Sequence, residues 1–425
     1  MDMESTESQG KEKQFLKKTD VAWVTGENIT SIITACVIGL ALPRFTGYET
    51  YAGYRAYTLF IGFAGFLHFG FINGLALCYG HLDYDKLPME RFRTYTRFLA
   101  LLEITVTVIL LAVYFPVSGG KITPFLFVII NLSLENMFQY FATVAEFTGL
   151  FKKSAIIQIT YRVSLLFCFI IFLLGKSDDY RRFLVLITII NILILILYVY
   201  SVKELVFGAS GRIRDHLEDI GEAIRRGFKI LTGEQLSLLI LGADSIFAMI
   251  FFDTKSFSLY SFAIYIVITA FYIINAANNV IFPYLKRQDE KEIEKRYRFL
   301  KRISVIISVV MTVMLFPCPI AIRKLIPGYV GSIPYLYVLA FTLVFKNLQA
   351  MACSNTMKAL DMEKEYLSVN ICACILAVLS DLVVCLTIRD LRFVAAASVI
   401  SFACWFFLCD AAINRRLKLS VNKSV

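Results

Sequence analysis

The stretch DVAWVTGENITSIITACVIGLALPRFTGYETYAGY, residues 20–54, decides the fold class of this chain. It carries no charged residue between Asn28 and Pro43, and with the turns before Asn28 it is long enough to cross a hydrocarbon layer of roughly 30 Å. Its polar opening, Thr25 to Asn28, returns 207 positions later as Thr232 to Gln235. Both copies stand at the head of an apolar run, so the sequence predicts two related halves.

Composition places the chain in a membrane. Hydrophobic residues make up 58% of it and the mean hydropathy is +0.68, above the roughly 45–50% apolar content of soluble proteins. The apolar segments are far longer than barrel strands, which predicts an α-helical bundle. Twelve such segments are expected, at residues 21–43, 55–80, 98–118, 122–151, 154–175, 183–202, 228–252, 256–285, 303–322, 329–352, 366–388 and 393–412.

The basic residues indicate an orientation. The net charge of +10 is spread over short runs between apolar segments, which argues against a nucleic-acid partner. With the N-terminus taken as cytoplasmic, 30 Lys and Arg residues fall on the cytoplasmic side and 11 on the other. This asymmetry predicts that both termini are cytoplasmic. The first apolar segment exceeds a signal-peptide core and lacks an early small-residue cleavage site, so we expect it to be retained.

The sequence offers little for catalysis or metal binding. The ten cysteines lie mostly inside apolar runs, in neither a disulfide nor a zinc spacing. There are only three histidines, the outer loops are short, and no phosphate-binding glycine loop occurs. We therefore expect no metal, no cofactor and no enzymatic activity.

The repeat extends into the next segment. A shift of 206 positions places Tyr54 on Tyr260 and Asn73 on Asn279. Each half then holds six spans, and an even number keeps the halves parallel, related by a pseudo-two-fold axis along the membrane normal with the substrate path between them. The predicted fold is all-α, with about 12 transmembrane helices in two six-helix lobes. The expected parts are a cytoplasmic tail 1–20, an N-terminal lobe 21–207, a cytoplasmic linker 208–227, a C-terminal lobe 228–412 and a second tail 413–425. Apolar residues at helical spacing between Ile213 and Ile230 predict a short surface helix at the linker.

Carboxylates inside spans are costly and mark functional hypotheses. The first and seventh segments each carry a polar stripe at helical spacing: Glu27, Ser31 and Thr34 on one, and Glu234, Ser237, Asp244 and Ser245 on the other. Glu27, Glu234 and Asp244 are candidates for ion coupling. The alternative is that each carboxylate caps or hydrogen-bonds a neighbouring helix.

Amides form a second candidate group. Asn275, Asn278 and Asn279 share one face of the eighth segment, and the repeat adds Asn73 on the second. Amides both donate and accept hydrogen bonds, which suits sugar hydroxyls. Amides also hold transmembrane helices together, and the sequence leaves the two interpretations open.

Three cations favour an anionic substrate. Arg55 begins the second segment, Arg162 lies in the fifth and Lys346 in the tenth. Such side chains bind phosphate or diphosphate by charge-assisted hydrogen bonds. Arg162 has an alternative, because Glu146 lies at similar depth on the preceding segment and the two could neutralise each other.

Residues 44–53, from Arg44 through Gly47, Glu49 and Tyr51 to Gly53, resemble a motif that closes the first helix of polysaccharide biosynthesis proteins of the O-antigen flippase type. In the second half, Gly227, Asp244 and the run from Leu259 to Ser261 are similar to that family's glycine, aspartate and tyrosine-serine positions. The resemblance implies the multidrug, oligosaccharidyl-lipid and polysaccharide (MOP) exporter superfamily, which includes the MATE transporters. It further implies a V-shaped cleft lined by the first, second, seventh and eighth helices.

The resemblance implies a flippase of the bacterial plasma (inner) membrane that acts by alternating access. Its substrate would be a polyprenyl-diphosphate-linked oligosaccharide, such as an O-antigen unit of lipopolysaccharide, and its partners membrane lipid and other polysaccharide assembly proteins. Arg55, Asn73, Asn275, Asn278, Asn279 and Lys346 are the expected cleft residues. An exporter of small cationic drugs and a membrane enzyme of polysaccharide assembly remain the alternatives.

Overall fold

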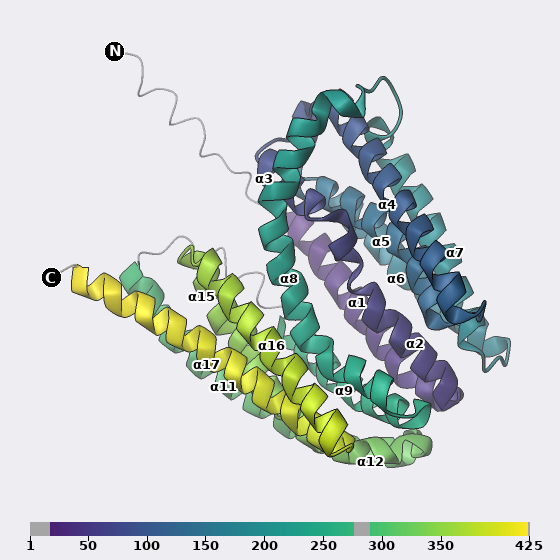
Figure 1. The fold of residues 1–425 in the computed structure, drawn as a ribbon, viewed down its shortest axis with the longest axis vertical. Coiled ribbons are helices and arrows are strands. Elements are labelled where there is room, and N and C mark those ends of the chain that lie inside the picture. The colour runs from purple at the N-terminus through teal and green to yellow at the C-terminus, as the bar shows by residue number, and fades with distance from the viewer. Residues whose placement is uncertain (1–17, 276–289, 424–425) are drawn as a thin grey trace.

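The computed structural model describes residues 18–275 and 290–423, and within these ranges it contains helices and no strand. Ten helices are long and apolar enough to cross a membrane, and two bent helix pairs raise the number to twelve. The expected all-α, polytopic architecture is confirmed. Figure 1 shows two groups of helices that converge at one end of the molecule, near α9 and α12.

The N-terminal lobe holds the first six spans. Its second span is broken into α2 and α3, which meet at an angle of 58°. Its helices are α1 (Lys18–Phe45), α2 (Tyr48–Ile61), η1 (Ala64–His68), α3 (Phe71–Tyr79), η2 (Tyr84–Lys86), α4 (Met89–Ser118), α5 (Pro124–Phe147), α6 (Phe151–Leu174) and α7 (Tyr180–Ser201).

The C-terminal lobe holds the other six, after a connection that contains η3 (Lys203–Leu205) and η4 (Ile213–His216). Its tenth span is also broken, by 45°. Its helices are α8 (Leu217–Phe251), α9 (Thr254–Asn275), α11 (Glu290–Leu315), α12 (Cys318–Leu325), η5 (Pro327–Ser332), α13 (Ile333–Ala340), α14 (Thr342–Asn347), the π-helix η6 (Leu348–Ser354), α15 (Asn355–Ala359), α16 (Glu363–Thr387) and α17 (Leu391–Lys423).

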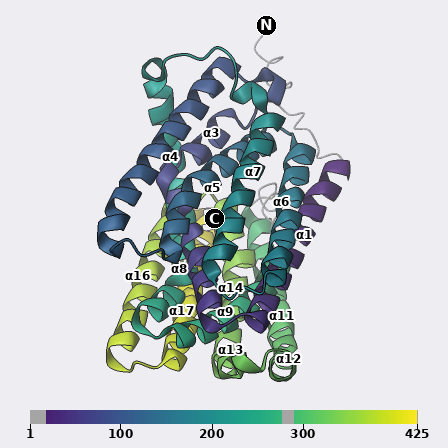
Figure 2. The same cartoon turned by 90° about the vertical axis from the view of Figure 1, so that its right-hand side faces the viewer.

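The two lobes repeat the same packing. In the N-terminal lobe α1 packs on α6, α5 packs on α7, and α2 and α4 both pack on α5. Six spans later α8 packs on α16, α13 and α14 pack on α17, α9 packs on α13, and α11 packs on α14. Figure 2 shows α4, α5, α7, α6 and α1 across the face of the N-terminal lobe. Equivalent spans therefore occupy equivalent places in two six-helix lobes.

The break in the second span lies where Phe69 and Gly70 adopt left-handed backbone angles, with φ of 50° and 84°. The buried amide of Asn136 supports the segment before it by donating to the carbonyl oxygen of Ala64 at 2.9 Å. After the break, α3 lies directly on α8. A Cβ added to Gly227 would stand 1.9 Å from the carbonyl oxygen of Gly70, so only glycine allows these backbones to approach so closely.

The seventh span is one continuous helix that contacts both lobes. The part of the expected linker from Leu217 onward, where a surface helix was anticipated, forms the first turns of α8, because no proline interrupts the chain up to Phe251. Gly227 packs on α3 of the N-terminal lobe. Further along, the carbonyl oxygen of Gly233 accepts a hydrogen bond from Asn370 on α16 at 3.3 Å.

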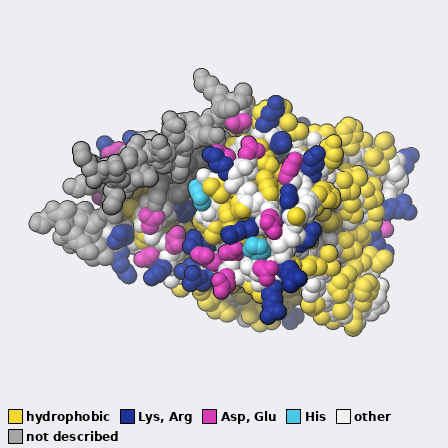
Figure 3. Space-filling model, turned by 90° about the horizontal axis from the view of Figure 1, so that it is seen from above, with side chains coloured by type: hydrophobic (Ala, Val, Ile, Leu, Met, Phe, Trp, Pro, Cys, Tyr) yellow, Lys and Arg dark blue, Asp and Glu magenta, His cyan; other side chains and the backbone are white. Residues whose placement is uncertain are grey.

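Charged residues gather at one end of the N-terminal lobe. Seen from above in Figure 3, Lys, Arg, Asp and Glu side chains lie together at this end and hydrophobic side chains cover the flank. Ion pairs here include Lys86 with Asp83 at 2.8 Å and Arg91 with Asp219 at 3.6 Å. A polar end above an apolar flank is what a membrane-spanning bundle requires.

Candidate substrate cavity between the two lobes

A cavity of about 640 Å³ lies between the lobes. Its walls come from α1, α2 and α6 of the N-terminal lobe and from α8, α9 and α14 of the C-terminal lobe. The first, second, seventh and eighth spans thus all contribute, as the resemblance implied. Its volume falls in the range of about 300–1,000 Å³ that is usual for ligand sites.

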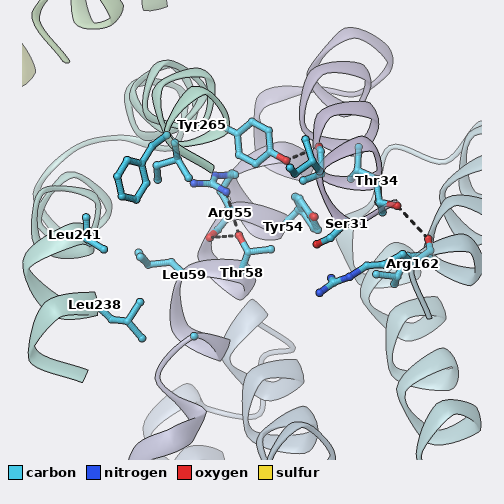
Figure 4. A pocket seen from close by; sticks show the side chains of 18 of the residues that line it. Ser31, Thr34, Tyr54, Arg55, Thr58, Leu59, Arg162, Leu238, Leu241 and Tyr265 are labelled. Atoms are coloured by element: carbon cyan, nitrogen blue, oxygen red, sulfur yellow. Dashed lines mark hydrogen bonds between the residues drawn. The ribbon is translucent and has the colours of Figure 1, made fainter. Parts of the chain in front are cut away.

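Three cations open onto this cavity: Arg55 from α2, Arg162 from α6 and Lys346 from α14. Figure 4 shows Arg55 below Tyr265, and Arg162 extending its guanidinium from α6. None of the described residues that line the cavity is acidic. Like charges at membrane depth are unfavourable together, so this arrangement favours an anionic ligand.

Aromatic rings support all three cations. The guanidinium carbon of Arg55 lies 4.9 Å from the centre of the Tyr265 ring, and that of Arg162 lies 5.1 Å from the Tyr161 ring. The Lys346 ammonium lies 4.4 Å from the Phe402 ring. Such contacts stabilise a desolvated cation by about 2 kcal/mol and leave its other hydrogen-bond donors free for a ligand.

None of the three cations forms a direct ion pair with a residue that the structure describes. Among the described residues, no carboxylate oxygen lies within the 4.0 Å ion-pair distance of Arg55, Arg162 or Lys346. The Nε atoms of Arg55 and Arg162 are buried and have no hydrogen-bond partner. Glu146, the alternative partner of Arg162, instead accepts from the Ser154 hydroxyl at 3.3 Å.

A second cavity, of about 420 Å³, adjoins the first, and both are lined by Gly62 and Leu238. Its polar lining differs from that of the main cavity and consists of Glu135 and Gln139 from α5, Glu234, Gln235 and Ser237 from α8, and Tyr366 from α16. The candidate Glu234 therefore faces this acidic side cavity. Asn73 lies beside it and donates to the Glu234 carboxylate at 3.3 Å.

Asp244 occupies a different environment, inside the C-terminal lobe. Its side chain is buried and accepts hydrogen bonds from Ser398 Oγ at 2.7 Å, from Tyr260 Oη at 3.1 Å and from the Ser245 amide at 2.6 Å. Asp381, also buried, interacts with it electrostatically, as Lys346 does from the cavity wall. Lys346 lines the main cavity and feels the charge of Asp244, although the two side chains form no direct ion pair.

The remaining candidates are placed less centrally. Glu27 lines neither cavity, although Asn28, Ser31 and Thr34 on the same helix line the main one, and it interacts electrostatically with Arg162. Asn278, Asn279 and the side chain of Asn275 lie outside the residues that the structure describes.

The motif of residues 44–53 forms the closed end of the inter-lobe space. Tyr48 donates to the carbonyl oxygen of Gly328 in the C-terminal lobe at 2.5 Å, and its ring centre lies 5.3 Å from that of Tyr329. Tyr51 is fully buried and contacts Tyr329 and Phe262, with ring centres 5.6 and 6.1 Å away. We call Tyr48, Tyr51, Phe262 and Tyr329 the aromatic gate.

Three residues near these sites were not singled out from the sequence, Glu135, Asp381 and Ser398, and Gln235 was noted only as part of the repeated polar opening. Glu135 and Asp381 are charges inside apolar segments, which is the same signal that marked Asp244. Gln235 and Ser398 carry no such signal, because amides and hydroxyls are common in transmembrane helices. Only the packing of α8 against its neighbours brings them to their sites.

Comparison with known proteins establishes the fold. The lipid II flippase MurJ in an inward closed conformation matches 94% of this chain and 88% of that chain, with a TM-score of 0.72 and 11% identity. A multidrug resistance MATE family transporter of the MOP superfamily matches in its inward-facing conformation (TM-score 0.69, 14% identity, 94% of this chain and 96% of that chain). A MATE family transporter in the outward-facing conformation also matches, with a TM-score of 0.65 and 14% identity over 95% of this chain and 94% of that chain.

No protein-family model and no curated protein matches the sequence. The structural similarity nevertheless shows that the chain has the fold of the MurJ and MATE structures. The proteins in these three structures are described as a lipid II flippase and a multidrug resistance transporter.

Proposed function

We propose that this protein is a flippase that moves a polyprenyl-diphosphate-linked oligosaccharide across the membrane by alternating access. One observation carries the proposal: three cations from both lobes, Arg55, Arg162 and Lys346, open onto one cavity without an ion-pair partner among the described residues. A diphosphate supplies the missing negative charge and several acceptor oxygens in one compact group. The similarity in fold to the lipid II flippase MurJ also supports a flippase.

The chemistry divides between the two cavities. The cations of the main cavity hold the diphosphate, polar residues nearby hold the sugars, and the polyprenyl tail stays in lipid. Because Arg55 and Arg162 belong to one lobe and Lys346 to the other, a bound diphosphate contacts both lobes at once. Rocking of the lobes then changes the side from which the bound group can leave.

Ion coupling is assigned to the carboxylates. A desolvated carboxyl group exchanges a proton as its environment opens and closes. Two of the three candidates interact electrostatically with cations of the main cavity, Glu27 with Arg162 and Asp244 with Lys346. If Glu27→Gln, Glu234→Gln and Asp244→Asn, combined in one protein, still allow normal polysaccharide export, this coupling is ruled out.

The proposal places the protein in a bacterial plasma (inner) membrane with both termini in the cytoplasm, beside other polysaccharide assembly proteins. Reporter enzymes fused to the C-terminus, one active only in the cytoplasm and one only outside it, test the orientation.

The central experiment measures inorganic pyrophosphate binding to the purified full-length protein, by thermal shift at constant ionic strength. We expect pyrophosphate to stabilise the wild type, and Arg55→Gln and Lys346→Gln each to raise the apparent dissociation constant at least about tenfold, since each removes a charge-assisted hydrogen bond. Glu222→Gln, at an exposed site on α8, is the control. Equal binding by all four proteins contradicts the proposal.

A second candidate is an exporter of cationic drugs, favoured by the acidic side cavity and the MATE fold match. Deletion of the gene separates the two. The flippase proposal expects loss of surface polysaccharide with unchanged drug susceptibility, and the drug-exporter alternative expects the reverse.

A further inference from the structure

The side cavity is rich in hydrogen-bond acceptors. Glu135 and Glu234 contribute carboxylates, and none of the described residues that line the cavity is Lys or Arg. Gln139, Ser237 and Tyr366 complete its polar wall from three helices. Its charge is therefore opposite to that of the adjoining cationic cavity.

Gln235 indicates that this wall is built for a ligand. Its side chain is only 6% exposed and lines the cavity, yet its carbonyl oxygen Oε1 has no hydrogen-bond partner. The room for this side chain comes from Gly65, where an added Cβ would stand 2.7 Å from Gln235 Nε2. A buried acceptor without a donor is unfavourable by about 1–3 kcal/mol, which a donating ligand would relieve.

Within residues 18–275 and 290–423, the two carboxylates also lack a cation within contact distance. Glu135 has no hydrogen bond or ion pair among the described residues, and Arg162 acts on it only at longer range. Glu234 accepts from Asn73, and Lys358 acts on it electrostatically without an ion pair. A group that donates hydrogen bonds and carries positive charge satisfies all three acceptors, whereas neutral hydroxyls leave the charge uncompensated.

We propose that the side cavity is a subsite for a sugar that carries a free, protonated amino group, with Glu135, Glu234 and the oxygen of Gln235 as its acceptors. The inference rests on the proposed function and names its substrate class. The two cavities share Gly62 and Leu238, so one amphoteric head group reaches both. Its diphosphate lies among the cations and its amino sugar lies among the carboxylates.

The test compares three soluble probes on the purified full-length protein: D-glucosamine, N-acetylglucosamine and D-glucose. Thermal shift is measured at equal concentration and ionic strength and at about pH 7, where the glucosamine amine is still largely protonated. We expect glucosamine to raise the melting temperature and the two neutral sugars not to do so. Glu135→Gln and Glu234→Gln each weaken glucosamine binding at least about tenfold, because each removes one charged acceptor.

Pyrophosphate provides the crossed control. Glu135→Gln and Glu234→Gln keep the pyrophosphate response, which also verifies that they fold, and Arg55→Gln keeps the glucosamine response. Equal stabilisation by glucose and glucosamine, or none by either, overturns the subsite. Glucosamine stabilisation that survives both carboxylate substitutions also overturns the subsite, because the amine then binds elsewhere. None of these outcomes affects the proposed function, which depends on the pyrophosphate response.

Discussion

Whether Arg162 pairs with Glu146 decides if its charge stabilises the fold or is available to bind a ligand. A buried ion pair with Glu146 would make its removal cost about 3–5 kcal/mol. In the structure the two side chains form no such pair, and Glu146 has the Ser154 hydroxyl as its partner. The charge of Arg162 is therefore available to a ligand.

We predict that Arg162→Gln lowers the free energy of unfolding by no more than about 2 kcal/mol, because it removes the contact with the Tyr161 ring and breaks no direct ion pair. Pyrophosphate binding falls at least about tenfold in the same variant. Thermal unfolding with and without pyrophosphate measures both quantities. A large loss of stability in the absence of pyrophosphate would support the structural alternative.

The Asp244 carboxylate gives a second prediction at this scale. Ser398→Ala removes the hydroxyl that donates to Asp244 at 2.7 Å, so the buried carboxylate loses one of its donors. We expect a loss of about 1.5–3 kcal/mol in unfolding free energy, as for hydrogen bonds to charged groups. The control is Ser368→Ala, since the exposed Ser368 hydroxyl bonds only within its own helix. Similar thermal unfolding of both variants would refute this account.

Some of these site residues could be recognised from the sequence and others could not, for a physical reason. Arg55, Lys346 and Asp244 are recognisable because a charge within an apolar run is costly and rare. Whether such a charge faces a cavity or a protein partner depends on packing between distant segments. Sequence reasoning therefore left Arg162 open between two roles and noted Gln235 only as part of the repeated polar opening, because the position of its side chain depends on Gly65 of another helix.

At the scale of the elements, the crossing of α3 and α8 joins the lobes through glycine. Added Cβ atoms at Gly227 and Gly74 would stand 1.9 and 1.8 Å from backbone oxygens of the facing helix. Backbone atoms cannot move aside as a flexible side chain can. The crossing therefore tolerates no larger residue at these positions without separating the helices.

We predict that Gly227→Ala destabilises the protein, by about 1–3 kcal/mol, the typical cost of overpacking. Gly221→Ala is the matched control on the same helix, because nothing lies within 4 Å of its added Cβ. The control should be neutral or stabilising by up to about 1 kcal/mol, since alanine favours the helix. Thermal unfolding of both proteins tests this, and equal effects would exclude the crossing as a tight contact.

The helices themselves could be predicted from the sequence, and their breaks could not. In lipid every backbone group must be satisfied within the protein, so a long apolar run predicts a helix with few alternatives. The break at Phe69 and Gly70 depends on left-handed backbone angles and on contact with α8. The same applies to the bend of the tenth span, which falls between α13 and α14 without a proline at the break.

At the scale of the molecule, the aromatic gate must open if the cavity is to reach the other side. Three of its ring pairs cross between the lobes: Tyr48 with Tyr329, Tyr51 with Tyr329, and Tyr51 with Phe262. At about 0.5–1.5 kcal/mol for each pair, together they stabilise the closed end by a few kcal/mol. A ligand that binds the open form more tightly than the closed form by more than this amount would shift the population toward the open form.

Locking this gate should therefore stop transport. A Cβ added to Gly328 would lie 3.8 Å from the Tyr48 hydroxyl, so Tyr48→Cys with Gly328→Cys can be joined by a short bifunctional maleimide. We predict that the cross-link abolishes surface polysaccharide export, because the lobes can no longer separate at this end. Export is measured in cells that carry the double variant, before and after cross-linking.

The controls separate locking from damage. The wild type treated with the same reagent accounts for the ten native cysteines. Tyr114→Cys with Lys121→Cys, which joins two positions within the N-terminal lobe where Tyr114 donates to the Lys121 carbonyl oxygen at 2.5 Å, should cross-link without loss of export. Full export after complete cross-linking of the gate pair would mean that the substrate passes without separation of the lobes, and alternating access would have to be abandoned for this protein.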